Sequence, residues 1–175
     1  VLATGRFGAP QIPQIPGLAS FTGPVCHSAR WDDTIRPGMR VAVVGSGASA
    51  IQIVPALVAA GSEVVNIQRS AAWILPKGDF AYDAQTQQQF RQDDQARSDY
   101  RQAILQDFDA GFLARFLGSA AQDHVRHRAL DHLNSQVNDE QLRMLLTPDY
   151  EIGCKRVLRS DDFYPAITSE HASLH

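Results

Sequence analysis

The hydrophobic pattern between residues 39 and 70 predicts a strand, a helix and a second strand in close succession. Met39–Val44 is an apolar run rich in β-branched residues, and a glycine-rich turn follows it. Ala48–Ala60 is typical of a helix, with Gly61 as a C-cap just beyond its end, and Glu63–Gln68 is typical of a second strand. This βαβ unit predicts a parallel sheet with a right-handed crossover, and the continuous apolar run predicts a first strand buried on both faces.

The composition changes after residue 79 and predicts a helical insertion over about 79–147. Apolar side chains recur there every four residues, at Tyr100, Ile104, Phe108, Phe112 and Phe116. This spacing predicts an amphipathic helix whose apolar stripe packs into the core, with a cofactor wall as the alternative. Two further helices are expected at about 119–136 and 139–146, and Asn138 or Asp139 can cap the last. Beyond the insertion, Asp161–Pro165 is typical of a turn.

These elements together predict an α/β fold: a Rossmann-like, doubly wound parallel sheet with a helical insertion. Residues 1–38 precede the βαβ unit and are rich in proline, and Val1–Gly5 is typical of the end of a strand and its turn. The prolines at positions 10, 13 and 16 favour an extended, rigid connector, with a peptide-recognition ligand as the alternative. We therefore expect a connector over 1–38 and a nucleotide-binding domain over 39–175.

Composition and charge exclude several classes of protein. The 175 residues are 44% hydrophobic and 20% charged with a net charge of −3, which argues against a nucleic-acid surface. Val41–Gly61 lacks charge, but its glycines and Pro55 divide it into two elements, so we expect no membrane span. Two cysteines favour a reducing, cytoplasmic location. His124, His127 and Asp131 share a helical face, for which a solvated surface is the expectation rather than a metal site.

A glycine-rich loop carries the main local chemistry. Its sequence is Gly45-Ser46-Gly47-Ala48-Ser49-Ala50, a G-x-G-x-x-A pattern between a strand and a helix. The first glycine permits the tight turn, the second lets a pyrophosphate approach the backbone, and the alanine permits close helix–strand packing. Because the helix N-terminus offers free N–H groups and a positive dipole end, this order of elements predicts dinucleotide binding.

The end of the second strand indicates which dinucleotide binds. NAD and FAD sites place an acidic residue there to hold a ribose hydroxyl. This chain has Arg69 and Ser70 instead. A guanidinium beside a hydroxyl suits the 2′-phosphate of NADP, whereas the alternative is an arginine that only solvates a strand end.

A second motif resembles a known family. Residues 21–32 match the pattern F-x-G-x-x-x-H-x-x-x-W followed by Pro or Asp, at positions Phe21, Gly23, His27, Trp31 and Asp32. This pattern resembles the fingerprint of the type I Baeyer–Villiger monooxygenases. The order of the proline connector, the fingerprint and the glycine loop is also similar to that family, and so are the stretches 68–77 and 146–156. The resemblance covers essentially the whole chain.

The resemblance implies that NADPH and FAD are cofactors and that one oxygen of O₂ is inserted beside the carbonyl of a small-molecule ketone. It implies that Gly45–Ala50 hold the NADP pyrophosphate and that Lys155 joins Arg69 and Ser70 at the 2′-phosphate. Arg156 resembles the catalytic arginine that stabilises negative charge near the flavin. The fingerprint residues would couple domain movement to the position of the cofactor.

The chain departs from the family's pattern because it holds no second glycine fingerprint for FAD, and the C-terminal part that completes the FAD domain and the substrate pocket is also expected to be absent. Residues 1–38 would then be an edge of the FAD domain and the connector. We therefore expect a piece of a larger enzyme, whose partner is the rest of the FAD domain. A related flavin monooxygenase that oxidises nitrogen or sulfur is one alternative, although Trp31-Asp32 favours the Baeyer–Villiger type. A stand-alone, non-catalytic NADP-binding module is the other.

Overall fold

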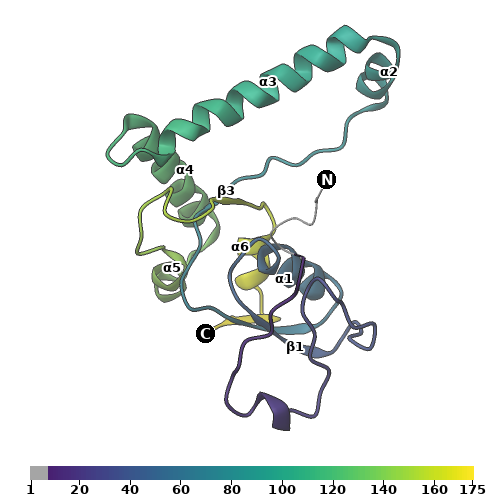
Figure 1. Cartoon of the computed structure of the whole chain (residues 1–175), viewed down its shortest axis with the longest axis vertical. Helices are drawn as coiled ribbons and strands as arrows, with labels where there is room; N and C mark the ends of the chain where they lie inside the picture. The colour runs from purple at the N-terminus through teal and green to yellow at the C-terminus, as the bar shows by residue number, and fades with distance from the viewer. Residues whose placement is uncertain (1–7) are drawn as a thin grey trace.

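The main sheet of the molecule is small and parallel. The structure is a computed structural model that describes residues 8–175. Its main sheet has the strand order β1-β2-β5, and both pairings are parallel: β1 is Arg40–Val44, β2 is Glu63–Ile67 and β5 is Ala172–Leu174. Helices α1 (Ala50–Ala59) and α6 (Phe163–Ile167) pack on each other beside this sheet (Figure 1). The α/β class and the parallel βαβ unit are confirmed.

The core joins the sheet to these two helices. Its buried apolar side chains include Ile51, Val54, Leu57, Val64, Phe163 and Ile167. Val54 is fully buried because it lies on the face of α1 that the sheet and α6 cover. Burial of a side chain of this size contributes about 1.5–3 kcal/mol to folding. The first turn of α1 is therefore held firmly at the end of β1.

The predicted burial of the first strand on both faces is wrong. Strand β1 alternates between exposed and half-buried residues, and Val44 is exposed. The reason is its place in the sheet, since among the described residues β1 pairs with β2 alone and forms an edge. An apolar run indicates that both faces of a strand can be buried, but it does not show which neighbouring elements cover those faces.

The insertion is helical, as predicted. In the sequence, it separates strands β3 (Ile74–Leu75) and β4 (Leu158–Arg159), which pair with each other in parallel and form a second sheet. Its helices are α2 (Ala84–Gln92), α3 (Asp94–Phe112), α4 (Ala120–Gln136) and α5 (Glu140–Leu146). Short 3₁₀ turns occur at Leu18–Ser20 (η1) and Leu113–Arg115 (η2). The side chain of Asp139 accepts a hydrogen bond from the Leu142 amide at 2.8 Å, which confirms it as the cap of α5.

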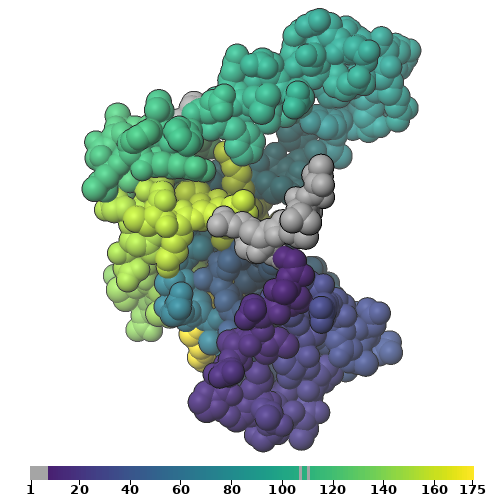
Figure 2. Space-filling model, viewed as in Figure 1, coloured from purple at the N-terminus to yellow at the C-terminus, as the bar shows by residue number. Residues whose placement is uncertain are grey.

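The predicted burial of the apolar stripe on α3 is also wrong. Helices α2 and α3 form an arm that extends away from the sheet along one side of the molecule (Figures 1 and 2). Four side chains of the stripe are exposed, Ile104, Phe108, Phe112 and Phe116, and so is the adjacent Leu105. The periodicity predicted the helix correctly. Its apolar face stays largely exposed to solvent, although Arg159 lies 5.3 Å above the ring of Phe108 and the rings of Phe112 and Phe116 are 6.0 Å apart.

The remaining expectations concern the segment after the insertion, the first residues and membrane helices. The predicted turn at 161–165 is wrong, because Phe163–Ile167 forms the short helix α6 and buries Phe163 and Tyr164. Burial of the Tyr164 hydroxyl in apolar surroundings raises its pKa well above the ordinary range. The expected strand end at Val1–Gly5 lies outside the described residues. Within residues 8–175, none of the helices is long and apolar enough to cross a bilayer.

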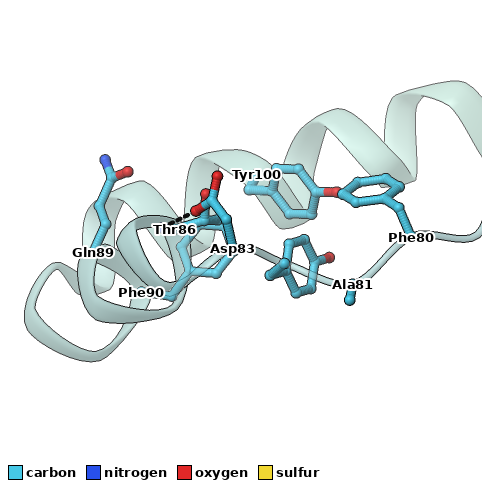
Figure 3. A pocket seen from close by; sticks show the side chains of 8 residues that line it. Phe80, Ala81, Asp83, Thr86, Gln89, Phe90 and Tyr100 are labelled. Atoms are coloured by element: carbon cyan, nitrogen blue, oxygen red, sulfur yellow. Dashed lines mark hydrogen bonds between the residues drawn. The ribbon is translucent and has the colours of Figure 1, made fainter.

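Aromatic side chains stabilise the far end of the arm (Figure 3). The rings of Phe80, Tyr82, Phe90 and Tyr100 contact one another with centroids 5.3–5.7 Å apart. They line a cavity of about 510 Å³. The side chain of Asp83 caps α2 at this point by accepting a hydrogen bond from the Thr86 amide at 2.7 Å. The segment after β3, α2 and α3 therefore pack together at one cluster.

Asp161 anchors the other end of the segment that leads into the arm. Its carboxylate accepts hydrogen bonds from the backbone amides of Lys77, at 2.8 Å, and Asp79, at 3.1 Å. These amides, that of Asp79 foremost, hold the pKa of the carboxyl below its ordinary value. Stability from this contact is therefore present above the pKa of the unfolded chain and is lost as the pH falls through the lower pKa of the folded chain.

Asp161→Asn should lower the melting temperature at pH 7 by a few degrees, because one charge-assisted interaction is worth about 1 kcal/mol and a chain of this size shifts by about 2–4 °C per kcal/mol. The difference from the wild type should narrow below about pH 4, where the unfolded carboxylate is protonated. Thermal unfolding at several pH values measures this. Asp162→Asn, at an exposed neighbour, is the matched control, and an equal effect of both substitutions would contradict the anchoring role.

Candidate nucleotide-binding site

The glycine-rich loop leaves the sheet at the end of β1 and turns directly into α1. Gly45 has a φ of +118°, a conformation that side chains with a Cβ rarely adopt. Its amide donates to the carbonyl of Ile67 at the end of β2, at 2.8 Å. The hydroxyl of Ser46 donates to the carbonyl of Ser70 at 2.6 Å. The loop is therefore joined to the residues that end β2.

The start of α1 offers unpaired donors to a ligand. Among the described residues, the backbone amides of Ser46, Gly47, Ala48 and Ser49 donate to no partner. Ser49, the N-cap, makes no side-chain cap, and the first turn of α1 carries no acidic residue. Free amides at the positive end of a helix dipole form an anion-binding site. The geometry of the loop therefore fits a pyrophosphate.

The second glycine and the final alanine of the loop differ in their surroundings. A Cβ built at Gly47 would meet no atom within 4 Å, so the space above this residue is open. Ala50, in contrast, is buried, as a small residue at a helix–strand contact would be. The structure thus leaves room for a ligand beside Gly47 and packs the protein tightly beside Ala50.

A second cluster forms at the end of β2. The ammonium of Lys155 donates to the hydroxyl of Ser70 at 2.9 Å, although the two residues are 85 positions apart. Lys155 also lies 4.1 Å above the ring of Tyr150. The neighbouring side chain of Arg69 is exposed and makes no hydrogen bond with a described residue. Arg69, Ser70 and Lys155 thus place two cations and a hydroxyl just beyond the end of β2, next to the loop.

The segment that carries Lys155 is fixed by buried contacts. The indole N–H of Trp73 donates to the carbonyl of Tyr150 at 2.8 Å, and the amide of the Gln122 side chain donates to the carbonyl of Ile152 at 2.8 Å. Trp73 and Gln122 are both buried. Desolvation raises the pKa of the Tyr150 phenol, so its ring stays neutral beneath the cation. The position of Lys155 is therefore determined by the insertion and the second sheet.

Arg156 follows Lys155 on the same segment, two residues before β4. Its side chain is exposed and makes no hydrogen bond or ion pair with a described residue. The guanidinium is thus available to a group outside this part of the chain. No described contact joins it to the glycine loop.

The fingerprint residues form a turn-rich connector that precedes β1. The ring Nδ1 of His27 accepts a hydrogen bond from the Ala29 amide at 3.1 Å. The carboxylate of Asp32 accepts from the side chain and the amide of Thr34, and these bonds lower its pKa. A Cβ at Gly23 would come within 2.7 Å of the ring of Phe21. Trp31 and Phe21 remain exposed, and among the described residues no hydrogen bond joins the connector to the glycine loop.

Comparison with known proteins identifies the relatives of the chain. No family model matches it. A Baeyer–Villiger monooxygenase of Pseudomonas aeruginosa is 35% identical over 175 residues, which cover 99% of this chain and 33% of that protein. A Baeyer–Villiger monooxygenase of Streptomyces coelicolor is 37% identical over 176 residues, which cover 99% of this chain and 34% of that protein.

The chain is thus similar over 99% of its length to proteins named Baeyer–Villiger monooxygenase. It spans about a third of the length of these curated relatives. An FAD-binding monooxygenase of Aspergillus niger is 39% identical and matches all of this chain and 29% of its own length.

Solved structures agree with this relationship. An oxidised steroid monooxygenase bound to NADP matches 94% of this chain and 38% of its own, with a TM-score of 0.74 and 25% identity. A cyclohexanone monooxygenase from Rhodococcus sp. Phi1 bound to NADP⁺ has the same fold over 99% of this chain and 39% of its own, with a TM-score of 0.79 and 20% identity. The fold of this chain is therefore shared with part of each of these two monooxygenases.

One residue that the sequence analysis missed contacts the glycine-rich loop. Asn66, in the middle of β2, is fully buried and donates hydrogen bonds from its side-chain amide to the carbonyls of Val43 and Gly45, each at 2.9 Å. The available signal was a lone amide within the apolar run Val64-Val65-Asn66-Ile67. Such a residue is out of place in a buried strand unless its polar atoms have partners.

Proposed function

We propose that the chain is the NADPH-binding part of an FAD-dependent Baeyer–Villiger monooxygenase, an enzyme that inserts one oxygen of O₂ beside a ketone carbonyl. Residues 39–175 would form the NADP domain, and residues 1–38 the connector to the FAD domain. The observation that carries the proposal is the contact between Lys155 and Ser70, which adds a second cation to Arg69 at the end of β2. The relatives' names and an NADP-bound structural relative support the same assignment.

The site fits the two phosphate groups of NADPH separately. The free amides of residues 46–49 would hold the pyrophosphate, and Gly47 would let it approach the backbone. Arg69, Ser70 and Lys155 would hold the 2′-phosphate, with the guanidinium giving paired, charge-assisted hydrogen bonds. NAD lacks this phosphate, so the cluster would favour NADPH over NADH.

FAD would be bound mainly by the remainder of the enzyme, because the described residues hold one glycine loop. When bound, FAD supplies the redox chemistry with O₂. Within this chain, the exposed Arg156 would provide a positive charge that stabilises negative charge developing on the substrate. The fingerprint residues on the connector would couple movement between the two domains to the position of the nucleotide.

Arg69→Ala should weaken NADPH binding by about 10- to 100-fold and leave NADH binding nearly unchanged, because it removes a charge-assisted contact to the 2′-phosphate alone. Titration of the purified chain with each nucleotide, by calorimetry or fluorescence, measures the ratio.

Arg40→Ala is the matched control for this substitution, since Arg40 is exposed at the opposite end of the same sheet. It should change neither affinity. Equal losses for NADPH and NADH in Arg69→Ala would contradict the assignment of the 2′-phosphate site. Failure of the wild-type chain to bind either nucleotide would overturn the proposed function.

A further inference from the structure

We propose that Asn66 is a positioning residue that holds the glycine loop in the conformation that binds the nucleotide pyrophosphate. This inference rests on the proposed function and extends it to a residue outside the loop. Asn66 belongs to β2 and lies directly opposite Val43 of β1 in the sheet register. Its side-chain amide bridges two carbonyls, those of Val43 and Gly45, at 2.9 Å each.

The side chain of Asn66 donates a hydrogen bond to the Gly45 carbonyl, which lies beyond the last residue pair of the sheet. The pairing of β1 with β2 ends at Val44 and Ile67. Beyond it, the Gly45 amide still reaches the carbonyl of Ile67, but the left-handed φ of +118° turns the chain out of the strand. The Gly45 carbonyl then accepts from Asn66 instead of from a strand neighbour. Gly45 is therefore held through both its amide and its carbonyl.

Burying the side-chain amide of Asn66 has a free-energy cost, which indicates that its hydrogen-bond donors are needed. Asn66 is 0% exposed, and its side-chain oxygen has no partner among the described residues. Val64 occupies the same face of β2, and it is apolar and buried. An apolar residue at 66 would avoid the unpaired oxygen, so packing alone does not explain the asparagine. Because two carbonyls face the NH₂ group, the orientation of the amide is also fixed.

Fixing Gly45 would determine where the next amides point. The donors of residues 46–49 bind an anion only while they converge on one place, and a loop already held in that conformation loses less entropy when the ligand binds. The hydroxyl of Ser46, bonded to Ser70, fixes the loop at a second point. Asn66 would thus act on the pyrophosphate site and not on the 2′-phosphate cluster.

The test compares three single variants of the whole chain. Asn66→Leu suits a buried strand and removes the donor, whereas Asn66→Asp keeps the shape but presents an acceptor to two carbonyls. Each should lower the affinity for NADPH and for NADH by the same factor, about tenfold, as expected for loss of the hydrogen bonds that preorganise a binding loop. The preference for NADPH should stay at its wild-type value, in contrast to Arg69→Ala.

Ser62→Ala is the matched control, because Ser62 is also fully buried, has an unpartnered side-chain oxygen and precedes the same strand. It should leave both affinities unchanged, whatever it does to the melting temperature. Lower melting temperatures with unchanged affinities in both Asn66 variants would overturn the inference, and so would a loss confined to NADPH. A wild-type chain that binds neither nucleotide would instead overturn the proposed function.

Discussion

Replacing Gly47 with valine should abolish NADPH binding, with a loss of at least about 100-fold, while the free chain stays folded. The expectation follows from two facts about this position. A Cβ at Gly47 would meet no protein atom within 4 Å, so the substitution creates no clash in the free chain. The same open space lies beside the free amides of the loop, where the pyrophosphate would approach the backbone. A branched side chain there would occupy the place of the ligand.

Gly111→Val is the control for this prediction, because a Cβ at Gly111 in α3 also meets nothing within 4 Å. It should leave NADPH binding intact, and thermal unfolding should show both variants folded. Gly45 is unsuitable for the same test, since its φ of +118° would make any substitution strain the backbone. Normal NADPH binding by Gly47→Val would show that the pyrophosphate does not pass over this residue.

The local geometry of the glycine-rich loop could be predicted from the sequence because it depends on neighbours in the chain. The turn at Gly45, the open space at Gly47 and the small Ala50 belong to one contiguous motif, and the structure places all three as expected. Lys155 is different, because it reaches Ser70 across 85 residues. No spacing in the sequence predicts that contact, and only the resemblance to a family indicated it. Asn66 was missed because its partners are backbone carbonyls, which leave no trace in a residue pattern.

The two wrong predictions of burial have a common physical origin. Strand β1 and the stripe of α3 both have apolar patterns that predict burial, but β1 is only half-buried and most of the stripe is exposed among the described residues. Periodicity reports the shape of an element and the face it offers, but burial also requires a neighbour. The chain spans about a third of its curated relatives. In the proposed function, the remainder of the enzyme would cover the parts of these two faces that are exposed here.

The turn predicted at 161–165 failed for another reason. Two aspartates and a proline are typical of a turn, yet Phe163 and Tyr164 pack into the core and draw the segment into α6. Pro165 is compatible with this because it lies in the first turn of that helix, where its missing N–H is not needed. Tertiary packing here outweighs a local preference of the kind that sequence reasoning weighs.

The role proposed for Arg156 is tested best by separating NADPH use from oxygen insertion. Lys155 is held by Ser70 and Tyr150, whereas Arg156 on the same segment is exposed and has no described partner. This difference suggests that adjacent cations serve different groups, Lys155 the 2′-phosphate and Arg156 the reacting centre. A planar guanidinium can give two parallel hydrogen bonds to a developing anion, which an ammonium cannot.

In the complete enzyme with FAD bound, Arg156→Ala should leave NADPH affinity and NADPH oxidation close to normal. Formation of the ester or lactone should fall by about 10²–10³-fold, the loss typical when one preorganised charge or donor is removed from a developing anion. Arg156→Lys should recover little, since it keeps the charge but not the planar fork. Lys155→Ala is the matched control and should show the reverse pattern, with a higher KM for NADPH and nearly normal product formation at saturation. NADPH consumption and product, measured in the same reaction, distinguish the two, and normal product formation by Arg156→Ala would remove Arg156 from the catalytic machinery.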